Sequence, residues 1–195
     1  MEIRKIGVIG AGTMGNGIAQ VAAQIGCDVI MRDIEDSFVD RGIKAIDKFL
    51  SKSVEKGKLA ADEKGKIMGR IKGTTKMADL KDVDFVVEAV IEDIALKKSV
   101  FKELDALCRP EVILSTNTSS MSITEIAAST KRPDKVCGMH FFNPVPLMKL
   151  VEIIRGYSTS DQTMATATGL AKKMEEVYLP GQAEPKIVEI ARDGG

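Results

Sequence analysis

The sequence has little of what several classes of protein require. Its formal net charge is zero, with 28 Lys and Arg against 28 Asp and Glu, so the overall charge favours neither a nucleic-acid-binding nor a membrane-binding protein. No apolar run approaches the ~20 residues that cross a bilayer. No basic region and hydrophobic stretch precede the first predicted strand at Ile3, so we expect no signal peptide. These absences predict a cytoplasmic protein without nucleic-acid or membrane partners.

Cysteine and histidine are scarce as well. The three cysteines, Cys27, Cys108 and Cys137, share no short spacing and cannot all pair with one another. We interpret them as core residues in a reducing compartment, and we expect neither a metal site nor a disulfide framework. His140 is the only histidine, and a lone histidine is more often structural than catalytic. The 195 residues, 44% apolar and 29% charged, suffice for one well-buried globular core.

The strongest pattern lies near the start of the chain. An apolar run, Ile6 to Ile9, precedes a helical pattern that Gly26 ends. Between them stands a G-x-G-x-x-G sequence: Gly10, Ala11, Gly12, Thr13, Met14 and Gly15. In such a sequence the first glycine allows a tight turn, the second lets the backbone approach a diphosphate, and the third lets helix and strand pack closely. The helix N-terminus attracts the anion. We therefore expect these six residues to bind a dinucleotide.

Asp33 favours one dinucleotide over another. It ends the second predicted strand, 18 residues after Gly15, where an acid would hydrogen-bond the ribose hydroxyls of NAD. A carboxylate there would repel the 2′-phosphate of NADP, so the expected cofactor is NAD. Arg32 could accept that phosphate if its side chain turned toward the ribose, and this alternative stays open. A glycine-rich turn that binds nothing would explain the glycines but not the position of Asp33.

Apolar runs and helical periodicities alternate along the rest of the chain. We expect further strands at residues 29–31, 71–75, 84–90, 112–115, 136–139 and 150–154, and further helices at 37–58, 60–68, 96–107, 122–129 and 161–175. This alternation predicts an α/β fold with a Rossmann-type, mainly parallel twisted sheet and helices on both faces. Ligands of such sheets gather outside the carboxyl ends of the strands. Candidate site residues are therefore Glu92, residues 115–120 and residues 140–143.

The segment from residue 41 to 76 is locally basic, with eleven Lys and Arg against four Asp and Glu. Within it Lys44, Lys48, Lys52 and Lys56 recur at every fourth position of a predicted helix, so they share a face. This face is either a solvated surface or a binding surface for a phosphorylated, polyanionic substrate. The residue pattern alone leaves both interpretations open.

Three stretches together resemble the L-3-hydroxyacyl-CoA dehydrogenase family, and most closely its bacterial 3-hydroxybutyryl-CoA dehydrogenase members. They are residues 10–15, the sequence STNTSS at 115–120, and HFFNPVPLMKLVE at 140–152. The resemblance runs from Ile3 to about Met174. It implies NAD-dependent oxidation of (S)-3-hydroxybutyryl-CoA, or another short-chain 3-hydroxyacyl-CoA, to the 3-oxoacyl-CoA, and the reverse reduction.

The resemblance also implies catalytic roles. His140 would be the general base that takes the proton from the 3-hydroxyl of the substrate, and Glu152 would orient its ring. The residues themselves permit this pair, because His140 follows a predicted strand and two prolines could fold the next strand back against it. Ser119 would hydrogen-bond the substrate oxygen, and Asn143 would position the nicotinamide, so both would contact the cofactor region as well.

Binding roles follow from the same resemblance. Glu92 and Lys97 match family positions near the ribose and nicotinamide of the cofactor. Lys52 and Lys56 match the segment that contacts the phosphates of coenzyme A, which favours a binding role for the basic face. An acyl-CoA is accordingly the expected partner, and no metal ion is expected.

Members of the family continue into a helical domain that closes over the substrate and forms their dimer interface. We expect residues 1–195 to be the NAD-binding domain alone, without this C-terminal helical domain, with a turn at 178–182 and a final strand at 185–192. Such a fragment should bind NAD but turn over acyl-CoA weakly or not at all, because closure is lost. A dehydrogenase of a free 3-hydroxy acid or sugar acid, and a non-catalytic NAD-binding module, remain alternatives.

Overall fold

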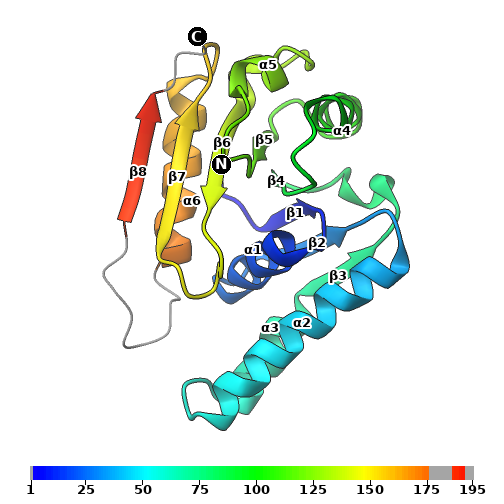
Figure 1. Ribbon diagram of the computed structural model, residues 1–195, viewed down its shortest axis with the longest axis vertical. Coiled ribbons are helices and arrows are strands. Elements are labelled where there is room, and N and C mark those ends of the chain that lie inside the picture. Colours follow the sequence, from blue (N-terminus) through cyan, green and yellow to red (C-terminus); the bar gives the residue numbers. More distant parts are fainter. Residues whose placement is uncertain (1, 176–185, 192–195) are drawn as a thin grey trace.

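Figure 1 shows the computed structural model of the chain, which describes residues 2–175 and 186–191. Its strands are β1 (Lys5–Ile9), β2 (Asp28–Arg32), β3 (Ile71–Thr74), β4 (Phe85–Glu88), β5 (Ile113–Thr116), β6 (Val136–Phe141), β7 (Leu150–Arg155) and β8 (Lys186–Ala191). Its helices are α1 (Thr13–Gln24), α2 (Asp36–Glu55), α3 (Ala61–Gly69), α4 (Ile94–Leu107), α5 (Ile123–Ala127) and α6 (Asp161–Glu175), with short 3-10 helices η1 (Met77–Leu80) and η2 (Pro133–Lys135). The prediction of an alternating α/β fold is confirmed.

The described strands form one sheet in the order β3-β2-β1-β4-β5-β6-β7-β8. Neighbouring strands are parallel from β3 to β6, and β7 is parallel to β8, but β6 and β7 are antiparallel. The register pairs Ile9 with both Arg32 and Glu88, and Glu88 with Thr116. The carboxyl ends of β1, β2, β4 and β5 therefore meet at one edge, where we expected the site.

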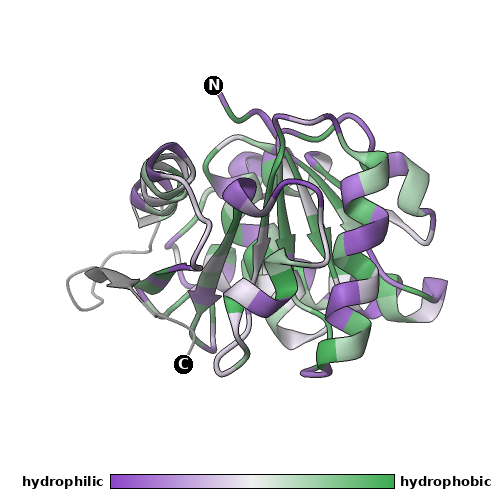
Figure 2. Cartoon of the chain, turned by 90° about the horizontal axis from the view of Figure 1, so that it is seen from above, coloured by the Kyte–Doolittle hydropathy of each residue, from purple (hydrophilic) through white to green (hydrophobic). Residues whose placement is uncertain are grey.

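Helices cover both faces of the sheet, as the sequence predicted. One buried cluster joins the sheet to α1, α2, α3 and α6 through residues such as Ile18, Ile46 and Met164. A second cluster on the opposite face includes Phe101 and Leu104 of α4 and Ile126 of α5. In Figure 2 the strands at the centre are mostly apolar, and polar residues lie on the outer helices.

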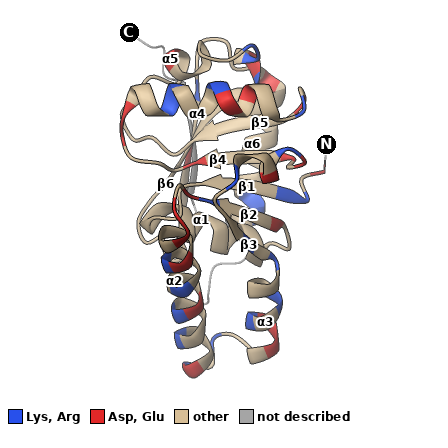
Figure 3. Ribbon diagram, turned by 90° about the vertical axis from the view of Figure 1, so that its right-hand side faces the viewer, with Lys and Arg blue, Asp and Glu red and all other residues tan. Residues whose placement is uncertain are grey.

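Helices α2 and α3 extend beyond the sheet side by side and are joined at their far end (Figure 3). We call this pair of helices the arm. The ammonium of Lys64 joins the two helices, lying 2.6 Å from Asp47 and 2.7 Å from the hydroxyl of Ser51. Helix α2 ends at Glu55, three residues earlier than predicted, and Gly57 follows it with a φ of +66°, which glycine adopts easily. Among the described residues no helix is long and apolar enough to cross a membrane.

The extent of β6 differs from the prediction in a way that matters for the site. We expected the strand to end at Met139, with His140 in the loop beyond it. Instead β6 continues through His140 to Phe141, because these two residues pair with Glu152 and Val151 of the antiparallel strand β7. The final strand predicted at 185–192 corresponds to β8, whereas the turn predicted at 178–182 lies outside the described residues.

The close packing of β6 predicts that Gly138 tolerates no side chain. A Cβ there would lie 2.8 Å from the Cβ of Ile154 on β7 and 3.0 Å from Ile123 of α5. We expect Gly138→Ala to lower the free energy of unfolding by about 1–3 kcal/mol, as overpacked cores do. Gly65→Ala is the matched control: it places the same methyl in open space on α3 and should stabilise by about 0.5–1 kcal/mol. Urea unfolding measures both, and equal effects would contradict the packing argument.

Candidate active site

The turn between β1 and α1 brings the helix N-terminus against the end of the strand. A Cβ on Gly15 would lie 1.8 Å from the carbonyl oxygen of Gly10, so only glycine permits this approach. Gly10 has a φ of +100°, and a Cβ there would lie 2.5 Å from the carbonyl oxygen of Ala89. A Cβ on Gly12 would meet nothing within 4 Å, and no side chain caps the helix there. The first amides of α1 are thus open to an approaching anion, which is what a diphosphate requires.

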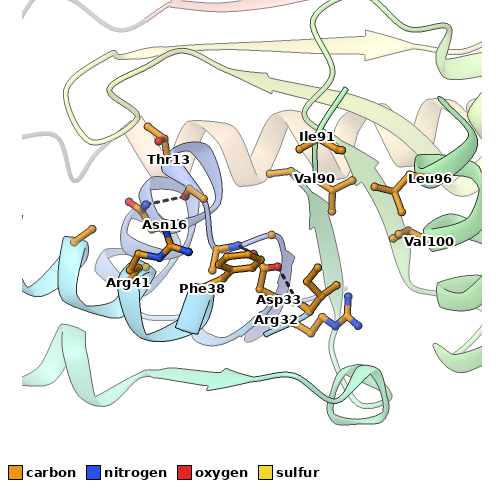
Figure 4. A pocket seen from close by; sticks show the side chains of 17 residues that line it. Thr13, Asn16, Arg32, Asp33, Phe38, Arg41, Val90, Ile91, Leu96 and Val100 are labelled. Atoms are coloured by element: carbon orange, nitrogen blue, oxygen red, sulfur yellow. Dashed lines mark hydrogen bonds between the residues drawn. The ribbon is translucent and has the colours of Figure 1, made fainter. Parts of the chain in front are cut away.

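A cavity of about 570 Å³ lies beside this turn. Figure 4 shows Thr13, Asn16 and Arg41 on one side of it and Val90, Ile91 and Leu96 on the other. Ile91 is 74% exposed although it is large and apolar, so a flat aromatic group in the cavity would cover surface that water now contacts. The size and this lining fit the adenosine portion of a dinucleotide.

Asp33 is held against the glycine turn. One of its carboxylate oxygens accepts a hydrogen bond of 2.7 Å from the amide of Ala11, and the other accepts one of 2.7 Å from the amide of Ile34. Each oxygen keeps a lone pair for a further donor such as a ribose hydroxyl. Arg32 also lines the cavity, but its Nε donates to the carbonyl of Thr75 at 3.3 Å, on the side of β3.

The six residues of the glycine turn divide into two groups. Residues 10–13 line the cavity, as expected for cofactor contacts. Met14 and Gly15 do not: Met14 packs partly buried against the apolar cluster of α1, and Gly15 is buried against β1. Their packing sets the position of the helix, and their predicted contact with the cofactor would come from their backbone amides rather than from side chains.

His140 and Glu152 lie opposite each other on β6 and β7. Their side chains are 2.9 Å apart, measured from Nδ1 to Oε2, and they are only 18% and 22% exposed. The ring of Phe142 packs beside the imidazole, with 4.5 Å between the ring centroids. Because Nδ1 faces the carboxylate, Nε2 is the nitrogen on which the ring can exchange a proton with a ligand.

Glu92 holds the loop that follows β5. Its Oε1 accepts hydrogen bonds of 2.9 Å from the hydroxyl of Thr118 and from the amide of Ser119. Burial opposes ionisation of the carboxyl, but these two donors and the nearby ammonium of Lys97 outweigh it and lower the pKa of Glu92 below its usual 4.5. The side chain of Ser119 is left exposed at the sheet edge.

The loop that joins β6 to β7 connects the histidine to the glycine turn. It carries the exposed Asn143, and it packs so closely on α1 that a Cβ on Gly17 would lie 2.8 Å from the Cβ of Val145. Behind it, the side-chain oxygen of Asn117 accepts a hydrogen bond of 2.7 Å from the amide of Phe141. The ends of β5 and β6 are thus fastened together next to α1.

Lys97 is buried behind the wall of the cavity rather than exposed in it. It is 1% exposed, and its ammonium is 2.7 Å from Glu88, 3.4 Å from Glu92 and 3.4 Å from the carbonyl of Val90. In the described residues the Lys97 ammonium donates to Glu88 and to the carbonyl of Val90 and forms an ion pair with Glu92, while its predicted contact with the cofactor stays a prediction. Sequence reasoning missed Glu88, which falls within the strand expected at residues 84–90; an acid inside such an apolar run was the available signal.

Lys52 and Lys56 lie on the arm with Lys44 and Lys48, all four exposed (Figure 3). None of them lines the cavity. The structure therefore keeps the basic face open to solvent but does not join it to the residues around the glycine turn.

Comparison with known proteins gives this arrangement a family. The family model described as "3-hydroxyacyl-CoA dehydrogenase, NAD binding domain" matches residues 5–180. The chain belongs to the 3-hydroxyacyl-CoA dehydrogenase family. The cofactor of this family domain is NAD, so the predictions of family, fold and cofactor are confirmed.

Individual relatives agree with the family assignment. The chain is 50% identical to the 3-hydroxybutyryl-CoA dehydrogenase of Clostridioides difficile and 52% identical to a probable 3-hydroxybutyryl-CoA dehydrogenase of Deinococcus radiodurans. Each match covers 94% of this chain and 66% of the relative. The crystal structure of (S)-3-hydroxybutyryl-CoA dehydrogenase from Ralstonia eutropha matches with a TM-score of 0.92 at 43% identity, covering 100% of this chain and 65% of that one. The chain thus spans about two thirds of the length of these family members.

Two glycines of the NAD-binding turn should separate folding from cofactor affinity. Gly12→Ala adds a methyl in open space where a diphosphate would approach, so we expect about tenfold weaker NADH binding with stability changed by only about 0.5 kcal/mol. Gly15→Ala forces the helix away from β1, so we expect NADH binding and about 1–3 kcal/mol of stability to be lost together. Fluorescence titration with NADH and urea unfolding measure the two quantities. A Gly12→Ala variant that binds NADH normally would contradict the location of the diphosphate.

Proposed function

We propose that this chain forms the NAD-binding and proton-transferring part of a dehydrogenase that oxidises (S)-3-hydroxybutyryl-CoA, or another short-chain 3-hydroxyacyl-CoA, to the 3-oxoacyl-CoA, and that runs the reverse reduction. The names of its relatives support the reaction. The observation that carries it is the 2.9 Å contact between His140 and Glu152, at the sheet edge that also holds the glycine turn. A non-catalytic NAD-binding module would have no use for such a pair.

His140 is the proposed general base. When bound, NAD supplies the acceptor for the hydride that leaves the 3-carbon of the substrate. Nε2 of His140 takes the proton of the 3-hydroxyl as the carbonyl forms, and it returns that proton in the reduction. The carboxylate of Glu152 accepts a hydrogen bond from the N–H at Nδ1, which keeps the ring oriented and stabilises the charged imidazolium once Nε2 is protonated.

Ser119 and Asn143 are proposed to position the reactants. Both side chains are exposed at the sheet edge, on loops anchored by Glu92 and by the packing of Val145 on α1. The hydroxyl of Ser119 would hydrogen-bond the substrate oxygen, and the amide of Asn143 would orient the nicotinamide. Fixed donors of this kind hold the reacting atoms in a near-attack geometry without reorganising during the reaction.

The proposal extends to the acyl-CoA and to the rest of the protein. Lys52 and Lys56 would contact the phosphates of coenzyme A, as the exposed basic face permits. Residues 1–195 would act as the NAD-binding domain, with closure over the substrate and dimerisation supplied by the part of its relatives that this chain does not span. The described cysteines are all buried and unpaired, which suits a cytoplasmic setting.

Removing the imidazole should slow catalysis strongly and spare cofactor binding. We expect His140→Ala in the whole enzyme to lower kcat by about 10²–10⁴-fold, the usual contribution of a general base. The Kd for NADH should stay unchanged, because His140 does not line the cavity. Absorbance of the reduced nicotinamide follows the rate of acetoacetyl-CoA reduction. An unaltered rate would remove His140 from the mechanism.

The basic face should distinguish a CoA thioester from a free acid. We expect the double variant Lys52→Gln/Lys56→Gln to raise the KM for acetoacetyl-CoA about tenfold, with an effect that shrinks as salt is added, because exposed charges are screened. Turnover of free acetoacetate should be slow and insensitive to the variant. Lys172→Gln, an exposed lysine of α6, is the control. Equal turnover of thioester and free acid would favour the free-acid alternative.

A further inference from the structure

A fully buried carboxylate has no part in the proposed mechanism. Glu88 ends β4 and is 0% exposed. Its carboxylate accepts three hydrogen bonds of 2.7 Å, from the amide of Val90, the ammonium of Lys97 and the hydroxyl of Thr116. Taking two charges out of water costs free energy that their attraction often fails to recover. Stability alone is therefore a poor reason for an ion pair at this point of the fold.

One of these contacts shapes the wall of the NAD cavity. The bond from Val90 to Glu88 turns the chain immediately after β4. In this turn the carbonyl of Ala89 approaches Gly10, while Val90 and Ile91 line the cavity opposite the helix. The position of that wall thus depends on where the Glu88 carboxylate is held.

The other contacts lead to the loop of Ser119. Lys97 is fixed by Glu88 and lies 3.4 Å from Oε2 of Glu92, a side chain that is 43% exposed and whose other contacts are all with the loop of Ser119. Glu92 in turn accepts the amide of Ser119. From its other oxygen, Glu88 holds Thr116, and its backbone carbonyl accepts the amide of Asn117 at 2.7 Å, two residues before Ser119.

We propose that Glu88 is a positioning residue: through Lys97 and Glu92 it holds the Ser119 loop in a fixed relation to the wall of the NAD cavity. The pair is buried because an immobile, desolvated ammonium places Glu92 better than a solvated one. The importance of this placement for catalysis rests on the proposed function of Ser119. The positioning of the loop by Glu88 can be tested without assuming that function.

The test uses the double variant Glu88→Gln/Lys97→Met. Both charges leave together and both volumes are nearly kept, so we expect the melting temperature to stay close to that of the wild type. Glutamine can still accept hydrogen bonds from its neighbours, but Glu92 loses the ammonium beside its Oε2 and is held only by Thr118 and Ser119 of the loop itself. We therefore expect the Ser119 amide to exchange its hydrogen about tenfold faster, measured by NMR. The amide of Lys131, which donates to Asp105 at 2.9 Å on another loop, is the control and should not change.

A purely structural pair predicts another result, namely unchanged exchange at Ser119 in a stably folded double variant, and this would overturn the proposal. So would an equal acceleration at Lys131. If the double variant fails to fold, Glu88→Asp keeps the charge on a shorter side chain that cannot span Thr116 and Lys97. It should accelerate Ser119 exchange without accelerating Lys131, and its failure to do so would also overturn the proposal.

Activity of the whole enzyme separates this inference from the proposed function. We expect the double variant to lower kcat for acetoacetyl-CoA about tenfold with a smaller change in KM, because Ser119 would act on the reacting oxygen. Faster exchange at Ser119 with unchanged kcat would support the positioning role of Glu88 and contradict the catalytic role of Ser119.

Discussion

The missing side chain of Gly15 is the constraint on which the site depends. A methyl there would overlap the carbonyl oxygen of Gly10, so any other residue would push α1 away from the end of β1. With glycine, the first turn of α1 reaches the sheet edge and its unpaired amides face outward. The wall after β4, the bond from Ala11 to Asp33 and the loop packed on Gly17 are all arranged around that helix end. The absence of a side chain at Gly15 thus lets the positive end of α1 lie at the sheet edge, where it can attract an anion.

The single antiparallel pair in the described sheet creates the second half of the site. In a parallel sheet the carboxyl ends of neighbouring strands carry different segments to one edge. Between β6 and β7 the chain instead reverses at that edge, so His140 and Glu152 become direct cross-strand partners. Cross-strand partners have their Cβ atoms within about 5.5 Å, close enough for the 2.9 Å contact between the two side chains. Sheet geometry, rather than a flexible loop, thereby sets the orientation of the imidazole.

Features that depend on residues close together in the chain could be predicted from the sequence, whereas features that depend on distant residues could not. The glycine turn and Asp33 depend on residues near one another in the chain, and the helices and strands depend on local periodicity, so both were predictable. The burial of Lys97 was not, because its acceptors come from the end of β4 and the loop beyond it, and a lysine in a helix is usually exposed. The extension of β6 through His140 was missed for a similar reason: it exists only because β7 supplies hydrogen-bonding partners.

The site has two parts that are held in place by different interactions. The cavity is lined by the glycine turn and by apolar residues after β4, whereas the histidine and its partner depend on strand pairing on the other side of β5. Hydride transfer would require the two parts to stay in register to a fraction of an ångström, and apolar packing alone tolerates small shifts of side chains. Hydrogen bonds that one buried carboxylate accepts from three separate segments are more directional than packing. Strand β4 lies between the glycine turn and the His140–Glu152 pair and ends in Glu88. Hydrogen bonds to this buried residue can therefore keep the two parts aligned without relying on exposed, flexible side chains.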